Sequence, residues 1–558
     1  MIKSFTRIFI FFVFIIGLGL KAQQNSNFET TKYLEIYFSL FKEINLNYVD
    51  PVNPGTLTSS AIEAMLKTLD PYTVYIPEGK VEDYQFLTTG EFGGIGASVH
   101  SYKNQIIVMA VYEEGPAIKA GLKPGDIIRE INNREFNANS TEEFDILIKG
   151  DPGTQISLSI FRPYLKEEKV IPIVREKIKL KNISYSALMA DQIGYIRLER
   201  FAEKASQDFG QALNNLRANT PLKGLIIDIR GNGGGLLNEA VNILGYFVPK
   251  GTFIVSTKGR DSYKDHSYFT TTTPIEPELP LIIIVDENSA SASEILAGSL
   301  QDLDRGIVLG HQTYGKGLVQ NVIPLAYKAQ LKITIAKYYI PSGRCIQRLT
   351  YNHNPDEPSQ EAVPDSLRHP FKTLNGRVVY DGAGIEPDLS TGIEKMPEIV
   401  WQLLSQMMIF NFSTEFAYKN PRIDAAEKFN LIESTYQDFK QFVVENGFKY
   451  DSYLEVQAQL LQKQFEEAEF DDHGQISTIQ ELLAKHKETE FEKYKVQLMR
   501  MLQDDIVSRY YPEDGRIKNY LKNDPELEKA LQLLSTSTTY NSIIDGSHPE
   551  SKNKKGSL

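Results

Sequence analysis

The chain has 558 residues, of which 41% are hydrophobic and 24% are charged, and its formal net charge is -12. This length exceeds what one hydrophobic core supports, and at roughly 100–200 residues per domain we expect about three to five units. The acidic balance, without a long basic stripe, argues against a nucleic-acid-binding protein, because basic faces bind phosphate backbones.

The N-terminus has the pattern of a secretory signal. Lys3 and Arg7 precede an apolar run over residues 8–20, and a short segment ending in Ala22 follows the run. The run is too short to span a bilayer comfortably, so we predict a signal peptide over residues 1–22, with an uncleaved membrane anchor as the alternative. We therefore expect an exported, periplasmic protein, and association with the inner membrane stays open.

The next three segments differ in their pattern. Two helical patterns separated by turn residues predict a helical N-terminal unit over residues 23–85. Residues 86–176 consist of short β-rich runs broken by glycine and proline, which predicts a compact domain. Over residues 177–395 apolar strands alternate with helical segments, which predicts an α/β core with helices on a largely parallel sheet.

Beyond this core the strand patterns disappear. Residues 396–540 contain long amphipathic segments and are predicted to form a helical C-terminal extension. Residues 541–558 are polar and lack periodicity, so we predict a disordered tail. The single cysteine, Cys345, cannot form an intrachain disulfide, so packed cores must supply the stability.

A serine lies where a strand gives way to a helix. The segment LIIIVDENSASASEILAGSLQDLDRG begins as a buried strand, passes through a turn of small polar residues and becomes a helix at about Ala292. Ser291 is therefore expected at a helix N-terminus, where backbone N–H groups favour the negative charge that a nucleophilic serine generates. The alternative is that Ser289, Ser291 and Ser293 only cap the helix.

A lysine framed by glycines follows the next strand. Lys316 lies in the loop HQTYGKG, where the glycines let the backbone approach closely. A lysine serves as a base only if burial or a neighbouring charge keeps it neutral. The alternative for Lys316 is a solvated surface charge.

The segment GLIIDIRGNGGGLLNEAV indicates a strand, a glycine-rich turn and a helix. It lacks the ending of a phosphate-binding loop, and Leu236 stands where a dinucleotide fingerprint requires its last glycine. Nucleotide binding is therefore disfavoured. We interpret the N–H groups around Gly234 as oxyanion donors, with a purely structural tight turn as the alternative.

Several motifs occur in one order along the chain: LDPYTVYI, GEFGGIGASV, GPAIKAGLKPGDIIREIN, DIRGNGGGLL, DENSASASEILAGSLQD, TYGKGLVQ, IPSGR and GIEPD. With them the chain resembles the C-terminal processing peptidases, or tail-specific proteases, over roughly residues 30–390. The resemblance implies a multidomain protein of mixed α+β and α/β class. Its parts would be the helical N-terminal unit, a PDZ domain, a crotonase-like (ClpP-like) serine protease core and the helical extension.

By this resemblance, Ser291 matches the nucleophile, Lys316 the general base and Gln320 the polar group that positions the lysine. Gly234 and the backbone N–H of Ala292 match the oxyanion hole. The implied reaction proceeds through an acyl-enzyme, which water activated by the same lysine hydrolyses. It requires no metal and no organic cofactor.

The chain departs from many relatives of this family in two respects. GNGGG replaces a more common turn with asparagine and proline, and the long helical extension has no assigned role. Among the acidic residues near Ser291, Asp286 and Glu287 are given no catalytic role, and Glu294 is interpreted as structural support for the site.

The resemblance also implies that the β-rich domain binds peptide C-termini. Backbone N–H groups would capture the terminal carboxylate while the peptide adds a strand beside a helix over residues 141–149. Apolar side chains at Ile95, Phe144 and Leu147 indicate either a groove for apolar tails or core positions. The expected carboxylate-binding loop consists of Phe92, Gly93, Gly94, Ile95 and Gly96.

Three rival interpretations remain. The chain could be a Ser/His/Asp hydrolase with His311 as its base, a catalytically dead PDZ scaffold, or a carrier for apolar ligands. The expected partners are proteins or peptides with apolar C-termini, and no nucleic acid. A lipoprotein adaptor, homo-oligomers through the terminal helices and a resting state with a misaligned dyad are left open.

Overall fold

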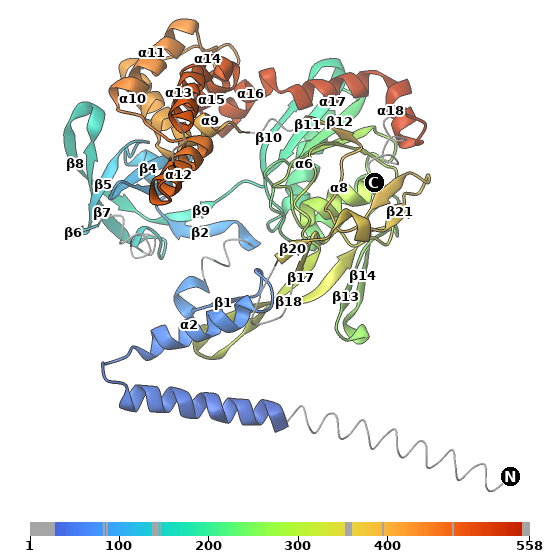
Figure 1. Cartoon of the computed structure of the whole chain (residues 1–558). Coiled ribbons are helices and arrows are strands. Elements are labelled where there is room, and N and C mark those ends of the chain that lie inside the picture. The colour runs from blue at the N-terminus through green and yellow to red at the C-terminus, as the bar shows by residue number, and fades with distance from the viewer. Residues whose placement is uncertain are drawn as a thin grey trace, which may run out of the picture.

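The computed structural model has four units along the chain (Figure 1). The predicted signal segment, residues 1–22, and most of the predicted groove helix, residues 141–149, lie outside the described residues. Within the described part no helix is both long and apolar enough to cross a bilayer. The structure describes residues 28–81, 84, 88–136, 144, 147–351, 360–392, 396–470 and 474–548.

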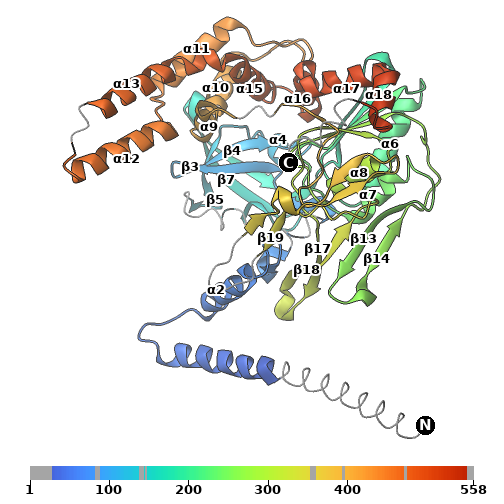
Figure 2. The same ribbon diagram turned by 45° about the vertical axis from the view of Figure 1, so that its right-hand side comes forward.

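The N-terminal unit is helical, as predicted, but it also adds a strand to the core. A helix over residues 28–47 lies away from the rest of the molecule (Figures 1 and 2). Helix α2 (Pro54–Lys67) begins where the Asn53 side chain accepts hydrogen bonds from two backbone N–H groups. Strand β1 (Val74–Ile76) then pairs antiparallel with β18 (Gln330–Tyr339).

The β-rich domain is built on one antiparallel sheet, ordered β3-β4-β5-β7-β8 with β6 beside β5. Alternate residues of β7 point into its core, as expected for a sheet with one face in water. A two-stranded ribbon of β2 (Glu91–Gly94) and β9 (Glu176–Lys179) joins this domain to the core. The elements of the sheet are β3 (Ala97–Tyr102), β4 (Gln105–Val111), α4 (Pro116–Lys119), β5 (Ile127–Ile131), β6 (Arg134–Glu135), β7 (Gln155–Arg162) and β8 (Glu167–Val174).

The α/β core has a six-stranded sheet ordered β10-β11-β12-β15-β16-β23, and every pair except β10–β11 is parallel. This confirms the predicted largely parallel sheet. All residues of β12 and β15 are buried, because helices cover both faces. The strands are β10 (Ile183–Leu188), β11 (Ile193–Leu198), β12 (Gly224–Asp228), β15 (Leu281–Val285), β16 (Ile307–Gly310) and β23 (Leu389–Ser390).

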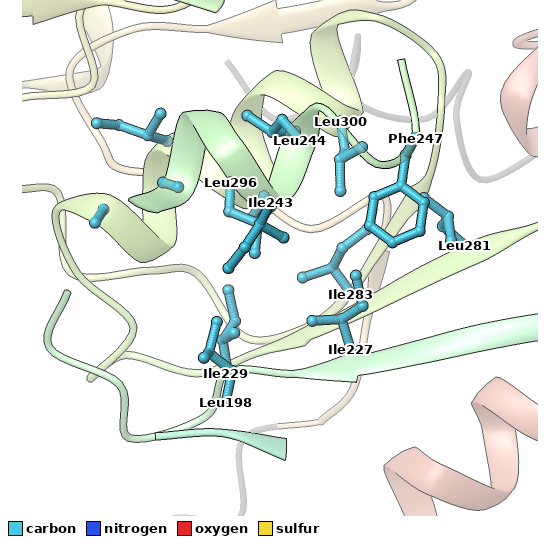
Figure 3. Close-up of a cluster of buried hydrophobic side chains, with 14 of the residues drawn as sticks. Leu198, Ile227, Ile229, Ile243, Leu244, Phe247, Leu281, Ile283, Leu296 and Leu300 are labelled. Carbon is cyan, nitrogen blue, oxygen red and sulfur yellow. The ribbon is translucent and has the colours of Figure 1, made fainter. Parts of the chain in front are cut away.

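One face of this sheet packs on α6 (Ala205–Arg217), α7 (Leu237–Leu244) and α8 (Ala292–Asp302). Figure 3 shows Ile227 and Ile283 of the sheet beside Phe247, Leu296 and Leu300. A second sheet, ordered β1-β18-β13-β14 with β17 beside β18, lies next to this layer. The further strands of this sheet are β13 (Phe253–Gly259), β14 (His266–Phe269) and β17 (Leu318–Pro324). Two separate antiparallel pairs are β19 (Leu349–Tyr351) with β20 (Gln360–Ala362), and β21 (Pro370–Lys372) with β22 (Val378–Tyr380).

The other face of the central sheet is covered by the C-terminal extension. Helices α16 (Glu513–Tyr520), α17 (Pro525–Ser535) and α18 (Ser537–Ile544) lie across it (Figure 1). Ile543 is buried there against the sheet. The prediction that a disordered tail begins at residue 541 is therefore wrong for residues 541–544. Ile543 and Ile544 lie within a polar stretch of sequence, but both pack against the apolar face of the sheet.

The rest of the extension forms a helical bundle with its own core around Phe412, Tyr436 and Leu502. This bundle also contacts the β-rich domain, where Met407 and Phe410 pack on Ile107. Helices α12 and α13 project from it (Figure 2). The helices are α9 (Glu398–Ser405), α10 (Met408–Lys419), α11 (Glu433–Glu445), α12 (Tyr453–Glu467), α13 (Gln475–Glu488), α14 (Glu490–Lys493) and α15 (Lys495–Val507).

The packing of α17 on the sheet predicts a difference between two chemically identical substitutions. Leu527→Ala removes a side chain that is 4% exposed and should cost about 2–5 kcal/mol of unfolding free energy. Leu454→Ala on α12 removes a side chain that is 59% exposed and should change it by no more than about 0.5 kcal/mol. Denaturant unfolding followed by circular dichroism measures both, and equal effects would show that α17 contributes no essential packing.

Candidate active site

Ser291 lies in a strained turn between β15 and α8. Its backbone has φ 57° and ψ -114°, a combination that non-glycine residues rarely adopt. Ser289 and Ser293 are fully buried, and their hydroxyls donate to the carbonyls of Ile229 and Asn232. Ser291 is only half-buried, so it alone of the three serines remains accessible at the helix N-terminus.

The glycine-rich turn after β12 faces this serine. Gly234 has φ +99°, and a Cβ at this position would lie 2.6 Å from the Ala290 oxygen and 2.8 Å from the Ser291 Cβ. Only glycine fits this approach. No described residue accepts a hydrogen bond from the Ala292 N–H, whereas the Gly234 N–H donates to the Asn232 side chain at 2.9 Å. Of the two predicted oxyanion donors, the Ala292 N–H is thus available and the Gly234 N–H is engaged.

Asn232 ties the glycine turn to the serine turn, and sequence reasoning did not single it out. It is fully buried. Its backbone oxygen accepts from the Ala290 N–H at 3.0 Å and from the Ser293 hydroxyl at 2.8 Å, and its Nδ2 donates to the Leu198 oxygen. The one signal in the sequence was a polar residue enclosed by glycines.

Glu294 is the buried carboxylate that joins the serine to the lysine loop. Oε2 accepts from the N–H groups of Ser291 at 2.8 Å and Lys316 at 2.9 Å. Oε1 accepts from the Thr313 hydroxyl at 2.6 Å and the Gly315 N–H at 2.7 Å. Burial raises the pKa of Glu294, although all four donors favour its charged form. The geometry agrees with the structural role expected for this residue.

Lys316 follows Gly315, whose φ of +87° turns the loop toward Glu294. The Lys316 side chain is half-buried, and its Nζ lies 4.6 Å from the centre of the Tyr72 ring. Burial, with a smaller effect of Lys332, lowers the pKa of Lys316 to about 8. This excludes a fully solvated surface lysine. Among the described residues no hydrogen bond links Nζ to the Ser291 hydroxyl.

No hydrogen bond joins Gln320 to Lys316 among the described residues. Its Nε2 donates to the Thr334 hydroxyl at 3.2 Å, and that hydroxyl donates to Asp70 at 3.1 Å. Asp70 and Tyr72 belong to the motif LDPYTVYI, which carried the family resemblance but no role. Sequence reasoning missed them because only the pairing of β1 with β18 brings this segment to the lysine.

His311 lies between two carboxylates. Its Nδ1 lies 3.5 Å from Glu287, and its Nε2 lies 3.7 Å from Glu526 of the C-terminal extension. Among the described residues no hydrogen bond joins His311 to Ser291, so the Ser/His/Asp alternative has no support in the geometry. They also contain no group of three His, Cys, Asp or Glu side chains that could hold a metal ion.

The first three residues of the expected carboxylate loop belong to the ribbon β2–β9. Residues 92–94 pair with residues 176–178, and Gly96 has φ +73°. Ile95 is 1% exposed and Phe144 is fully buried, so both belong to the domain core rather than to a groove. Leu147 packs partly buried against the same core. The groove interpretation is therefore wrong for Ile95 and Phe144, because the sheet needs these side chains to close its apolar face.

A cavity of about 560 Å³ opens beside the lysine loop. Its apolar lining includes Leu69, Leu318 and Leu349, and Asp70 lies at the same wall. Gln347 also lines it and accepts a hydrogen bond from the Gly317 N–H at 2.8 Å, next to Lys316. The cavity can therefore receive an apolar group close to the lysine loop.

The shared carboxylate predicts a severe effect of Glu294→Gln. The amide has one acceptor oxygen, so in either orientation its NH₂ group faces two donors. We expect the free energy of unfolding to fall by about 2–5 kcal/mol, because the serine and lysine loops lose their common acceptor. For the same reason we expect activity to be lost. Thermal unfolding and the cleavage rate measure both effects. Glu481→Gln, the same change at an exposed position of α13, is the control, and a Glu294→Gln protein as stable as this control would contradict the assignment.

Three family models match the chain: peptidase family S41 over residues 192–357, a PDZ domain over residues 93–171, and the C-terminal helical domain of a probable PDZ-protease over residues 399–534. A solved structure titled photosystem II D1 C-terminal processing protease has 26% identity and a TM-score of 0.36, and the match covers 65% of this chain and 88% of that one.

Two curated relatives extend the match beyond single domains. A carboxy-terminal-processing protease of Bartonella bacilliformis is 36% identical over 62% of this chain and 79% of its own length. The carboxy-terminal processing protease CtpB of Bacillus subtilis is 34% identical over 66% of this chain and 79% of its own. With a PDZ domain, an S41 core and a helical C-terminus all present, the chain belongs to the carboxy-terminal processing protease family and is a serine-type peptidase.

Proposed function

We propose that this protein is an exported endopeptidase that cleaves near substrate C-termini with a Ser291/Lys316 dyad. One observation carries the proposal: the fully buried Glu294 holds the backbone of both residues, at 2.8 Å and 2.9 Å. The lysine held in this way has a pKa of about 8, as a general base near neutral pH requires. Export rests on the pattern of residues 1–22, and the periplasm is the compartment that we propose.

The reaction follows from these groups. Neutral Lys316 takes the Ser291 hydroxyl proton while Oγ bonds to the substrate carbonyl carbon, and the Ala292 N–H donates to the resulting oxyanion. The C–N bond then breaks, and the leaving amine receives the proton from Lys316. Water, losing a proton to the same lysine, attacks the carbonyl carbon of the acyl-enzyme. The C–Oγ bond then breaks, Ser291 Oγ takes the proton back from Lys316, and the carboxylic acid is released. Because Lys316 now lies over Tyr72, the side chain must rotate toward Ser291 before the first step.

Substrate selection is proposed for two sites. The PDZ domain, with its glycine-rich ribbon over residues 92–96, would bind the terminal carboxylate through backbone N–H groups. The cavity at Leu318 and Leu349 would receive an apolar side chain beside the scissile bond. A lipoprotein adaptor and oligomers through the terminal helices are compatible with this scheme and are not needed for it.

The first test is cleavage of an unfolded protein with an apolar C-terminus, with a metal chelator present throughout. Wild type should cleave it, and Ser291→Ala and Lys316→Ala should each lower the rate by at least about 10³-fold. Lys328→Ala, on an exposed turn, is the matched lysine control and should leave the rate unchanged. Activity that survives in either dyad variant would refute the dyad. Inactive wild type would favour the PDZ scaffold.

The lysine pKa predicts the pH profile. Since only neutral Lys316 accepts the proton, kcat/KM should rise with pH, reach half its maximum near pH 8 and level off above it. Lys332→Gln removes a nearby positive charge, so the pKa of Lys316 should rise and the midpoint should move upward by roughly half a pH unit. Lys328→Gln, exposed on the turn before the same strand, is the control. A downward shift in Lys332→Gln would contradict lysine as the base.

A further inference from the structure

Arg230 connects the glycine-rich turn to the C-terminal extension. It lies directly before Gly231, at the end of β12, and its side chain is 11% exposed. Its Nη2 donates to Asp228 at 2.6 Å and to Asp524 at 2.6 Å, and its Nη1 donates to Glu526 at 2.7 Å. Two of its three carboxylate partners thus come from α17, which is distant in sequence from the peptidase core.

These two carboxylates are themselves fixed. Asp524 caps α17, since its Oδ1 accepts from the N–H groups of Glu526 at 2.9 Å and Leu527 at 3.2 Å, while Oδ2 accepts from Arg230. The other oxygen of Glu526 accepts from the Thr391 hydroxyl at 2.6 Å, and it lies 3.7 Å from His311 in the lysine loop. The start of α17 therefore contacts the glycine turn through Arg230 and the lysine loop through His311.

Hydrogen bonds from the residues on either side of Arg230 link it to the turn that holds Ser291. The Gly231 N–H donates to Asp286 at 2.9 Å, and the Ile229 oxygen accepts from the Ser289 hydroxyl at 2.8 Å. Both partners belong to the turn that presents Ser291. Gly234, in the same glycine turn, approaches Ser291 so closely that it has no room for a Cβ. A displacement of Arg230 would therefore change the spacing between the glycine turn and the serine.

Stability alone is a weak explanation for this cluster. Buried ion clusters often stabilise a fold less than apolar residues of the same volume, because desolvation offsets the attraction. Apolar packing already holds α17 to the sheet through Leu527, Ala530 and Leu533. The carboxylates fix the orientation of the Arg230 side chain, since a guanidinium bonded to several fixed carboxylates has little freedom to move.

We propose that Asp524 and Glu526 are positioning residues for the peptidase reaction: through Arg230 they set the glycine turn against Ser291, and this contact holds the Ala292 N–H in the geometry that stabilises the oxyanion. The C-terminal extension is then a working part of the active site rather than an accessory domain. The inference rests on the proposed Ser291 chemistry. It concerns the transition state, so it predicts an effect on kcat and little effect on KM.

The test uses Asp524→Asn/Glu526→Gln in the full chain. Both changes keep size, and asparagine still caps a helix, but two negative charges are lost. At one fixed pH, kcat on an unfolded substrate should fall about tenfold while KM stays within about twofold. A peptide boronic acid, which forms a tetrahedral anion on the serine, should bind about tenfold more weakly. The single variants repeat the measurement if the double variant does not fold.

Leu533→Ala is the matched control, because it weakens the packing of the same helix without touching the carboxylates. It should lower the unfolding temperature and leave kcat and the boronate affinity unchanged. Folded carboxylate variants with wild-type kcat and boronate affinity would overturn the proposal, and so would equal losses in Leu533→Ala. If wild type itself neither cleaves nor binds the boronate, the proposed function fails instead.

Discussion

The buried carboxylate of Glu294 is the interaction on which the active site depends. Its two oxygens accept four hydrogen bonds, and the donors come from the serine turn and from the lysine loop. A buried charge without such donors would cost several kcal/mol, so neither segment can move away without leaving it unsatisfied. The same carboxylate lies in the first turn of α8, where the helix dipole also favours negative charge. The backbones of the proposed nucleophile Ser291 and the proposed base Lys316 are therefore held by one carboxylate.

The central sheet has a similar dependence on segments far apart in the sequence. Its strands are buried on both faces, and the second face is covered only when α16 to α18 return from the C-terminal end of the chain. The helical bundle that precedes them also contacts the PDZ domain through Met407 and Phe410. One extension thus contacts both the domain proposed to bind substrate tails and the domain proposed to cut them, which gives a structural role to a segment without strands or motifs.

Lys316 lies between two opposing influences. The Tyr72 ring stabilises the ammonium form, whereas burial and Lys332 favour the neutral form. The structure brings the lysine close to the serine turn without a hydrogen bond between the two side chains. The backbone of the site is thus assembled, and the proposed dyad requires a rotation of the Lys316 side chain toward Ser291. A resting state that a bound tail releases remains a hypothesis consistent with this arrangement.

The sequence by itself determined the local elements and pointed to Ser291 and Lys316 as the candidate residues. The βα alternation predicted the parallel sheet, and the serine turn, the glycine turn and the lysine loop each carried its own local signal in glycines, small polar residues and an adjacent apolar run. Such patterns are readable because they arise from backbone conformation and from periodic burial, which neighbouring residues decide.

Only the tertiary structure decided which contacts form between these segments. The roles of Asn232, Asp70 and Tyr72 depend on strands that pair far apart in the chain, and Ile95 and Phe144 proved to be core because the sheet of the PDZ domain closes over them. Ile543 is buried because it packs on a face of the central sheet, whose strands are distant in the sequence. Long-range burial and hydrogen bonding leave no local pattern, since their partners are chosen by the whole fold rather than by neighbours in the chain.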